Sequence, residues 1–376
     1  MKRKATSGQV ADNSIELQVC LPSGRREAIS VSQFGTVADL KVAAQLSLEQ
    51  PFLRLVTADG RLLDPTESLQ FSEFQDGGSL TAIAQQPKIA STWNAFALWC
   101  DGCDRIVTWG NPDDGGDSSG VRDQLRNVQQ ICGTEFAFAA LLADRSVVTW
   151  GHPNFGGDSS TVREQLRNVK QIFCRYNAKA FAAILADGSV VTWGHPNDGG
   201  DSTGVQGRLR NVRQICGTAS AFAAILSDGS VVTWGHPNHG GNSTSVQGWL
   251  RNVQQICGTG CAFAAILEDG NVVTWGDQDY GGDSYEVQDQ LKNVQHISAT
   301  YGAFAAILED GSVVTWGLPH CGGDSASVQG QLRNVQQVCG ASHAFAAILA
   351  DGAVVTWGIP NQGGDSSGVQ DQFICI

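Results

Sequence analysis

The sequence has few charged residues and no long apolar run. Charged residues make up 16% of its 376 residues, below the share of about a quarter that is usual in globular proteins. No stretch stays apolar for long enough to span a membrane, and the amino-terminal residues lack the apolar centre of a secretory signal. We therefore expect an intracellular protein, cytoplasmic or nuclear, that does not enter a membrane.

Motifs that build catalytic or cofactor sites are also missing. There is no phosphate-binding Gly-Lys-Ser/Thr and no His-Glu-x-x-His. His152, His195 and His236 share the context Trp-Gly-His-Pro, but zinc needs its ligands together, and we expect these histidines to be separate loop residues. Cys100-x-x-Cys103 stands without a second pair at zinc spacing. We expect no catalytic residue, no metal site and no cofactor, and hence a protein that is not an enzyme.

The charge that is present is unevenly divided. The net charge is −13, and residues 1–90 contain nine basic and ten acidic residues. Residues 91–376 therefore hold fifteen basic and twenty-seven acidic residues and carry about −12. An acidic body repels phosphate backbones, so direct nucleic-acid binding is disfavoured. We expect a protein partner instead, and a basic one fits best.

The sequence does contain a repeat. The dipeptide Trp-Gly occurs seven times, and successive tryptophans are 41, 43, 41, 41, 41 and 41 residues apart. A fixed period of this length indicates an array or a propeller. Because a residue present in every copy builds the copy, we assign these tryptophans to the repeat core: Trp109, Trp150, Trp193, Trp234, Trp275, Trp316 and Trp357.

Each copy has the pattern of short strands. In residues 211–250, apolar runs of four to six residues alternate with Gly, Asp and Asn, and Asp228-Gly229 predicts a tight hairpin. The second copy has Asp144-Arg145 at this turn, a costlier choice because the turn needs positive φ. Three clear strands and a weak fourth, Val-Gln-x-x-Leu, predict one propeller blade. We therefore predict a mainly β chain in which residues 85–376 form a seven-bladed β-propeller.

The pattern Ile-x-x-Gly…Ala-x-Ala-Ile-Leu-x-Asp-Gly-x-Val-x-x-Trp-Gly resembles the regulator of chromosome condensation repeat. The likeness covers residues 85–376, although the loop after tryptophan reads Gly-Gly-Asp-Ser where that family has another glycine-rich segment. The resemblance implies a closed propeller that binds proteins. A WD-type propeller has a similar period, but the Trp-Asp dipeptide is absent, so we rank it second.

Residues 15–84 predict a separate α+β domain. Strands are expected at 15–21, 28–31, 53–56 and 79–83, with a helix capped by Thr36 and Asp39. The order and the run from Leu53 to Leu69 resemble ubiquitin, which implies a β-grasp fold. The positions matching ubiquitin's apolar patch are Val56 and Ile83, while the third falls on Pro22. Residues 1–14 are expected to be a disordered basic tail.

Four of the eleven cysteines, Cys132, Cys216, Cys257 and Cys339, recur in phase with the repeat. We expect them to fill space in or near the core. Since the sequence shows no secretory signal, a disulfide framework is not expected.

The copies differ from one another at two places, and we expect partner contacts there. One departure is a two-residue insertion in residues 173–179, which brings in Arg175, Tyr176 and Lys179. The fifth copy replaces His-Pro-Asn with residues 277–280, ending in Tyr280, and adds Tyr285. Tyrosine and arginine are enriched at binding hot spots.

Three functions are compatible with this organisation. The first is a non-enzymatic scaffold for protein–protein interaction, linked by its ubiquitin-like domain to ubiquitin-pathway proteins. The second is nucleotide exchange on a Ran-type GTPase, although copy lengths that vary by only two residues leave no room for the projecting wedge that the resemblance would require. The third is the substrate-recognition part of a HECT-type ubiquitin ligase without its catalytic domain. We favour the first.

Overall fold

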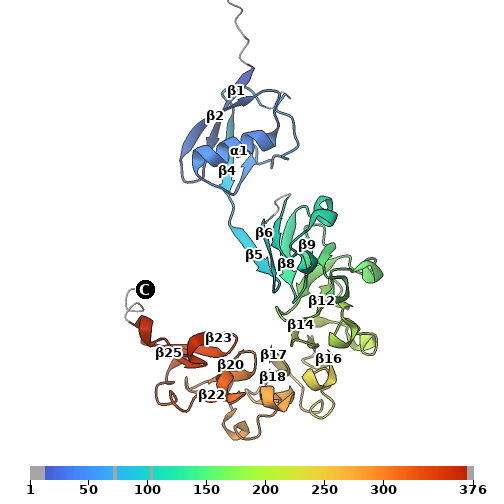
Figure 1. Cartoon of the computed structure of the whole chain (residues 1–376), viewed down its shortest axis with the longest axis vertical. Helices are drawn as coiled ribbons and strands as arrows, with labels where there is room; N and C mark the ends of the chain where they lie inside the picture. The colour runs from blue at the N-terminus through green and yellow to red at the C-terminus, as the bar shows by residue number, and fades with distance from the viewer. Residues whose placement is uncertain (1–12, 71–73, 102–104, 371–376) are drawn as a thin grey trace, which may run out of the picture. The chain divides into compact units, whose positions relative to one another are not determined.

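The computed structural model describes residues 13–70, 74–101 and 105–370 (Figure 1). The chain divides into two compact units, residues 1–88 and 89–376. Residues 1–12 of the predicted basic tail and Cys103 lie outside the described residues, and Ser14, predicted as part of the tail, is instead the first residue of a strand. No helix in the described part of the chain is long and apolar enough to cross a membrane.

The first unit is a four-stranded sheet covered by one helix. Its elements are β1 (Ser14–Cys20), β2 (Arg26–Ser32), α1 (Val37–Leu48), β3 (Leu53–Val56) and β4 (Ser79–Ala84), with strand order β2-β1-β4-β3. The central pair β1 and β4 is parallel, whereas the outer pairs are antiparallel. The predicted capping box is present, because Thr36 and Asp39 exchange hydrogen bonds at the start of α1.

Alternation along β3 and β4 places side chains on opposite faces of this sheet. Leu53, Leu55 and Ala82 belong to the core that includes α1. Val56 is therefore directed to the other face, where it is partly exposed, and Ile83 is exposed there as well. The two residues of the predicted apolar patch thus lie on one face of neighbouring strands.

The second unit is mainly β and consists of seven three-stranded antiparallel sheets, one per copy (Figure 1). The first strands are β5 (Pro87–Ser91), β8 (Val128–Gly133), β11 (Val169–Phe173), β14 (Val212–Gly217), β17 (Val253–Gly258), β20 (Val294–Ala299) and β23 (Val335–Gly340). The middle strands are β6 (Ala95–Cys100), β9 (Ala137–Leu142), β12 (Ala180–Leu185), β15 (Ala221–Leu226), β18 (Ala262–Leu267), β21 (Ala303–Leu308) and β24 (Ala344–Leu349). The third strands, which contain the repeat tryptophans, are β7 (Val107–Gly110), β10 (Val147–Gly151), β13 (Val190–Gly194), β16 (Val231–Gly235), β19 (Val272–Gly276), β22 (Val313–Gly317) and β25 (Val354–Gly358).

The predicted hairpin turns join the second and third strands. Gly229, at the turn of the fourth sheet, has φ of 77°, a left-handed conformation that suits glycine. Arg145 keeps the same turn in the second sheet with φ of 66°. The turn is therefore retained there in spite of the strain that a side chain brings.

The predicted fourth strand is wrong. The Val-Gln-x-x-Leu segment forms turns instead of pairing with the third strand, as at Gln206–Arg208 and Gln288–Gln290. The glutamine side chain takes the strand's place, since Gln206 Nε2 donates to the carbonyl of Val190 at 2.9 Å. Four other copies repeat this bond, at 2.9–3.3 Å. A side-chain amide thus satisfies an edge carbonyl that a fourth strand would otherwise cover.

Successive sheets pack through a repeated interface. Between the third and fourth sheets, Ala180, Ala182 and Ile184 meet the stacked rings of Phe222 and Trp234. Six such clusters link the seven sheets in order. Each interface also contains a hydrogen bond from the indole Nε1 to a glycine carbonyl of the preceding copy, at 2.9–3.2 Å.

The two end sheets each leave half of this interface open. Trp109 stacks on Phe96 as in other copies, with ring centroids 5.3 Å apart, but it is 43% exposed whereas the other repeat tryptophans are 3–5% exposed. In the seventh sheet, Ile348 is exposed while its equivalents are buried. In the described part of the chain, no apolar cluster joins the seventh sheet to the first.

Candidate interaction surface

One end of the array is built from two sets of loops. The first set joins the first and second strands of each sheet, and the second set follows the repeat tryptophan. Backbone hydrogen bonds hold the two sets together, as where His152 N–H donates to the carbonyl of Phe136 at 2.9 Å. We call this surface the loop end. Six of the seven histidines and all four tyrosines lie in its loops, so the copies differ most in chemistry here.

The first set of loops is connected from sheet to sheet. Trp93 N–H donates to the carbonyl of Glu135, and Glu135 N–H donates to that of Ala178, at 3.1 and 2.9 Å. Gly260 N–H bonds Tyr301, and Tyr301 N–H bonds Ser342, in the same way. These backbone bonds hold the first loops of neighbouring sheets side by side.

The insertion in residues 173–179 is held against the neighbouring sheets. Arg175 Nη1 donates to the carbonyls of Gly217 and Gly258, which end the first strands of the fourth and fifth sheets. The guanidinium lies 5.8 Å from the centre of the Tyr176 ring. Arg175 is thus engaged inside the protein, while Tyr176 is exposed and Lys179 is half-buried.

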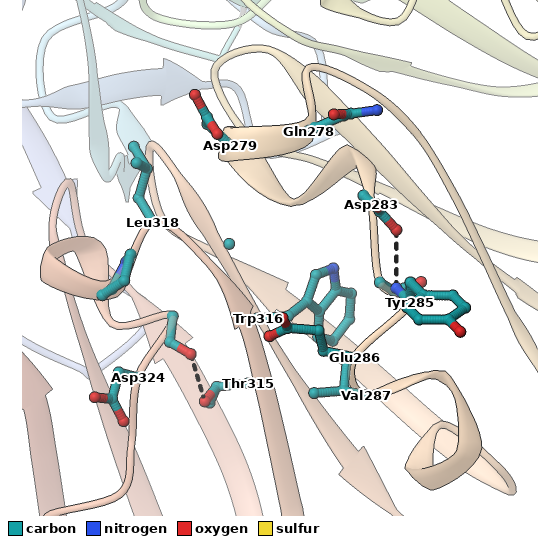
Figure 2. A pocket seen from close by; sticks show the side chains of 14 residues that line it. Gln278, Asp279, Asp283, Tyr285, Glu286, Val287, Thr315, Trp316, Leu318 and Asp324 are labelled. Carbon is teal, nitrogen blue, oxygen red and sulfur yellow. Dashed lines mark hydrogen bonds between the residues drawn. The ribbon is translucent and has the colours of Figure 1, made fainter.

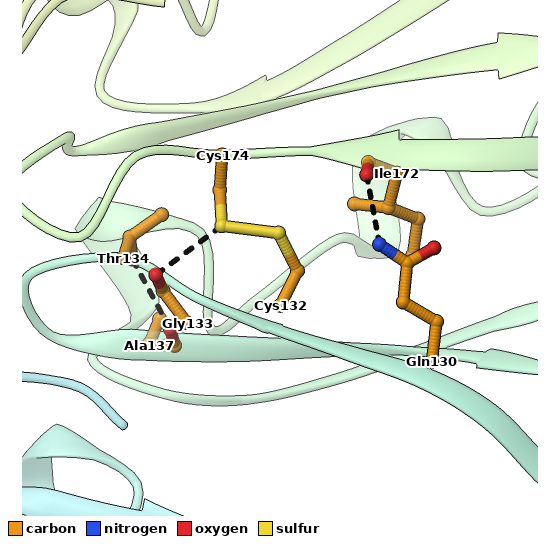
Figure 3. Close-up of a disulfide and its surroundings, with 7 residues drawn as sticks. All are labelled: Gln130, Cys132, Gly133, Thr134, Ala137, Ile172 and Cys174. Atoms are coloured by element: carbon orange, nitrogen blue, oxygen red, sulfur yellow. Dashed lines mark hydrogen bonds between the residues drawn. A yellow bond between two sulfur atoms is a disulfide. The ribbon is translucent and has the colours of Figure 1, made fainter. Parts of the chain in front are cut away.

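A disulfide joins this insertion to the second sheet, contrary to the expectation from sequence (Figure 3). It links Cys132 to Cys174, 42 residues apart in the chain, with Cα atoms 6.3 Å apart. The insertion makes the pairing possible, because Phe173 takes the repeat position and Cys174 follows it. Beside the disulfide, Gln130 Nε2 donates to the carbonyl of Ile172 at 3.1 Å, a second link between the two sheets.

The repeat-phased thiols are otherwise free and mostly shielded. Burial raises the pKa of Cys216 to about 11 and that of Cys257 to about 12. Both thiols are therefore protonated and weakly nucleophilic at neutral pH. Cys339 is exposed, so the expected role of filling space near the core does not extend to it.

Tertiary structure brings the two odd copies near each other at the loop end. The ring of Tyr280 meets that of Tyr301 edge-on at 5.5 Å, and Tyr301 lies 5.9 Å from His343. Burial, followed by the nearby Tyr280, Cys261 and Tyr176 groups, raises the pKa of Tyr301 to about 12. Tyr301 thus packs on Tyr280 of the fifth copy, and Tyr176 of the insertion lies near enough to affect its pKa.

The three Trp-Gly-His-Pro histidines are separated by other rings. Phe155 lies between His152 and His195, at 4.7 and 5.9 Å from their ring centres. His236 packs on His239 at 4.3 Å, and burial lowers the pKa of His239. In the described ranges, no three His, Cys, Asp or Glu side chains lie close enough to hold a metal ion. These histidines are loop residues packed against aromatic neighbours.

Tyr285 lies in a groove between the loop of the fifth copy and that of the sixth (Figure 2). The groove has a volume of about 700 Å³ and is lined by Asp279, Asp283, Glu286 and Asp324. Among the described residues, no lysine or arginine lines it. Tyr285 is 86% exposed. Its backbone N–H donates to Asp283 Oδ1 at 2.9 Å, which holds the backbone of Tyr285 in place.

The other copies have small residues where the fifth has Tyr285-Glu286. The equivalent pairs are Ser119-Gly120, Ser160-Thr161, Thr203-Gly204, Thr244-Ser245, Ala326-Ser327 and Ser367-Gly368. The preceding aspartate accepts the same backbone bond in other copies, as Asp117 does from Ser119 at 2.8 Å. The aspartate therefore stabilises its own loop, whereas the large side chains of Tyr285 and Glu286 are not required by the repeat, since the other copies lack them.

No protein-family model and no curated protein matches this chain. Solved structures with a similar arrangement include yeast Prp20 from Saccharomyces cerevisiae, described with its binding to Gsp1p and histones, at 16% identity and a TM-score of 0.42 over 75% of this chain and 88% of that one. Human WBSCR16 is similar at 16% identity and a TM-score of 0.39 over 70% and 87%. A design based on ubiquitin matches 19% of this chain and 89% of its own, at 23% identity and a TM-score of 0.18. All three TM-scores are below 0.5. The description of the second unit as an array of repeated three-stranded sheets is therefore based on its own strand pairing.

Proposed function

We propose that this protein is a non-enzymatic scaffold that binds a basic protein partner. The observation that carries the proposal is the groove of the fifth copy, where an exposed tyrosine stands among four carboxylates. The other copies have small residues at the position of Tyr285, so the fold itself does not require it. An exposed aromatic side chain in an acidic groove suits a lysine- or arginine-rich segment.

Replacing Tyr285 and Glu286 by serine should abolish partner capture without affecting stability. Loss of a hot spot costs 2 kcal/mol or more, which corresponds to a drop in affinity of about thirtyfold. The immobilised full chain would be exposed to cell extract, and bound proteins identified by mass spectrometry. Thr244→Ser, at the equivalent position of the fourth copy, is the matched control. If Y285S/E286S and T244S retain the same proteins, the groove is not the binding surface.

The same proposal includes the ubiquitin system and an intracellular location. The β-β-α-β-β order of residues 15–84 and the outward position of Val56 and Ile83 support a ubiquitin-like domain that binds ubiquitin-pathway proteins. Nucleotide exchange on a Ran-type GTPase is the first alternative, and accelerated release of labelled nucleotide by catalytic amounts of the chain would favour it. Recognition of substrates for a HECT-type ligase is the second alternative, and capture of such a ligase together with a substrate would favour that.

We further propose that residues 85–376 close into a seven-bladed ring in solution. The open face of the first sheet presents Phe96 and Trp109, and the open face of the seventh presents Ala346 and Ile348. These are the two halves of the interface that is repeated six times within the array. In a closed ring, Trp109 Nε1 would donate to the carbonyl of Gly363 as the seventh copy of the indole bond.

Ring closure predicts that Trp109→Ala destabilises the protein as strongly as Trp150→Ala, by about 3–5 kcal/mol. An open end would make Trp109→Ala nearly neutral, because a partly exposed ring has less to lose. Chemical denaturation of both variants measures the difference. Sedimentation at several concentrations separates closure within one chain from head-to-tail packing of two copies, since only the second depends on concentration.

A further inference from the structure

A second region of the loop end combines aromatic rings with buried carboxylates. Trp93, in the first sheet, is 59% exposed, and its ring lies 6.0 Å from that of Phe136 in the second. The line of rings continues from Phe136 to Phe155 at 5.0 Å and on to His195. Exposed aromatic faces attract cations through their quadrupole.

Glu135 lies beside these rings and has an unusual environment. Its residue is only 8% exposed, yet none of the hydrogen bonds among the described residues reaches its carboxylate. Burial raises the pKa of Glu135, and the carboxylates of Asp198 and Asp114 raise it further, whereas Lys179 lowers it. Neither of its oxygens is among the fully buried atoms that lack a partner, so the carboxylate is accessible from solvent although most of the residue is covered.

The nearby charges do not balance. Asp114 is buried and accepts a hydrogen bond from Asn94 Nδ2 at 2.9 Å. Asp198 lies 2.6 Å from His195 Nδ1 and is mostly buried. The three carboxylates of Asp114, Asp198 and Glu135 share one ammonium, that of Lys179. Lys179 forms no ion pair within 4.0 Å in the described part of the chain. Among the described residues, no ammonium or guanidinium therefore lies within ion-pair distance of the Glu135 carboxylate.

We propose that this region binds a lysine or arginine side chain of a partner protein. The cationic group would lie against the rings of Trp93 and Phe136 on one side and beside the carboxylate of Glu135 on the other. The incoming cation supplies the hydrogen-bond donors that Glu135 lacks and stacks on rings that are already in place. The site is distinct from the Tyr285 groove, being formed by the first three copies. This inference rests on the proposed scaffold function in one respect only, namely that a partner protein supplies the cation.

The test is a titration of the full chain with fluorescein-labelled penta-arginine at 0.15 M salt, followed by anisotropy. The variant Y285S/E286S serves as the background, so that the acidic groove does not contribute. We expect Trp93→Ala and Glu135→Gln each to weaken binding by about 5- to 30-fold. Lys179→Ala should have the opposite effect and tighten binding, because it removes the competing cation.

Controls separate this site from general attraction to an acidic surface. Trp249→Ala removes a tryptophan that is 66% exposed and outside the ring cluster, and Glu164→Gln removes an exposed carboxylate. Both should leave binding unchanged, and Trp93→Phe should retain most of it. Equal losses in Glu135→Gln and Glu164→Gln, or weaker binding in Lys179→Ala, would overturn the inference. The peptide titration is independent of the pull-down, so loss of partner capture in Y285S/E286S with intact peptide binding leaves it standing.

Discussion

Replacing Trp234 by alanine is expected to lower the free energy of unfolding by about 3–5 kcal/mol. The indole is 3% exposed, stacks on Phe222 at 5.4 Å, and donates its Nε1 hydrogen to the carbonyl of Gly199 at 3.1 Å. The substitution leaves a cavity between the third and fourth sheets and an unsatisfied carbonyl beside it. Urea denaturation followed by circular dichroism measures the change.

The matched control for this experiment is Trp249→Ala. Trp249 is mostly exposed, so its removal should change the free energy of unfolding by no more than about 0.5 kcal/mol. If both tryptophans prove equally dispensable, the repeat tryptophans do not form the interface between sheets, and the packing scheme described here is wrong.

Replacing Gly240 by alanine is expected to cost about 2–5 kcal/mol, the sum of two effects. Gly240 has φ of 93° and a Cβ there would lie 2.5 Å from Phe263 Cδ2. The left-handed conformation alone costs an L-residue about 1–2 kcal/mol, and forcing a methyl group into a packed interface adds about 1–3 kcal/mol. The difference between variant and wild type in thermal and urea unfolding gives the total.

Two further glycines separate these effects. Gly248→Ala should be nearly neutral, because nothing lies within 4 Å of a Cβ there and φ is not in the left-handed range. Gly363 has φ of 103°, but a Cβ would meet only Ala344 Cβ at 3.9 Å. Gly363→Ala therefore isolates the backbone effect if the array stays open, and approaches the full cost of Gly240→Ala if the first sheet packs there. A neutral Gly240→Ala would contradict the described contact with Phe263.

Much of the local structure followed from the sequence, because it depends on near neighbours in the chain. Asp228-Gly229 determines its turn through the φ that glycine permits. Thr36 and Asp39 cap their helix across three residues. The alternating Ala-Phe-Ala pattern defines a middle strand with one face toward each neighbouring sheet, and the phase of Trp-Gly identifies its partner strand.

The prediction of a fourth strand is wrong for a reason that the periodicity of the sequence does not show. Val-Gln-x-x-Leu has an apolar spacing that a short strand could use, and its leucine is buried in the structure, as Leu209 and Leu250 show. Whether such a segment pairs depends on what already occupies the edge of the sheet. Here the glutamine side-chain amide donates to the edge carbonyl that a fourth strand would otherwise bond. Whether the side chain can reach that carbonyl depends on the folded structure.

The composition of the candidate surfaces could be listed from sequence, but their assembly could not. The departures of residues 173–179 and of the fifth copy from the repeat were enough to single out Tyr176, Tyr280 and Tyr285. Only the packing of sheets brings Tyr301 onto Tyr280, pairs Cys132 with Cys174, and sets Trp93 beside Glu135 and Phe136.

The physical reason is the difference between local and long-range contacts. Turn chemistry, strand alternation and the repeat period are set within about ten residues, so the sequence by itself determined a mainly β chain of seven copies after an α+β unit. Contacts between sheets join residues 41 or 42 positions apart, as Cys132 and Cys174 are, and an identical pattern in every copy does not say which side chains will meet. The tertiary structure alone decided where the carboxylates, rings and thiols come together, and it left Trp109 exposed at one end of an interface that is buried six times elsewhere.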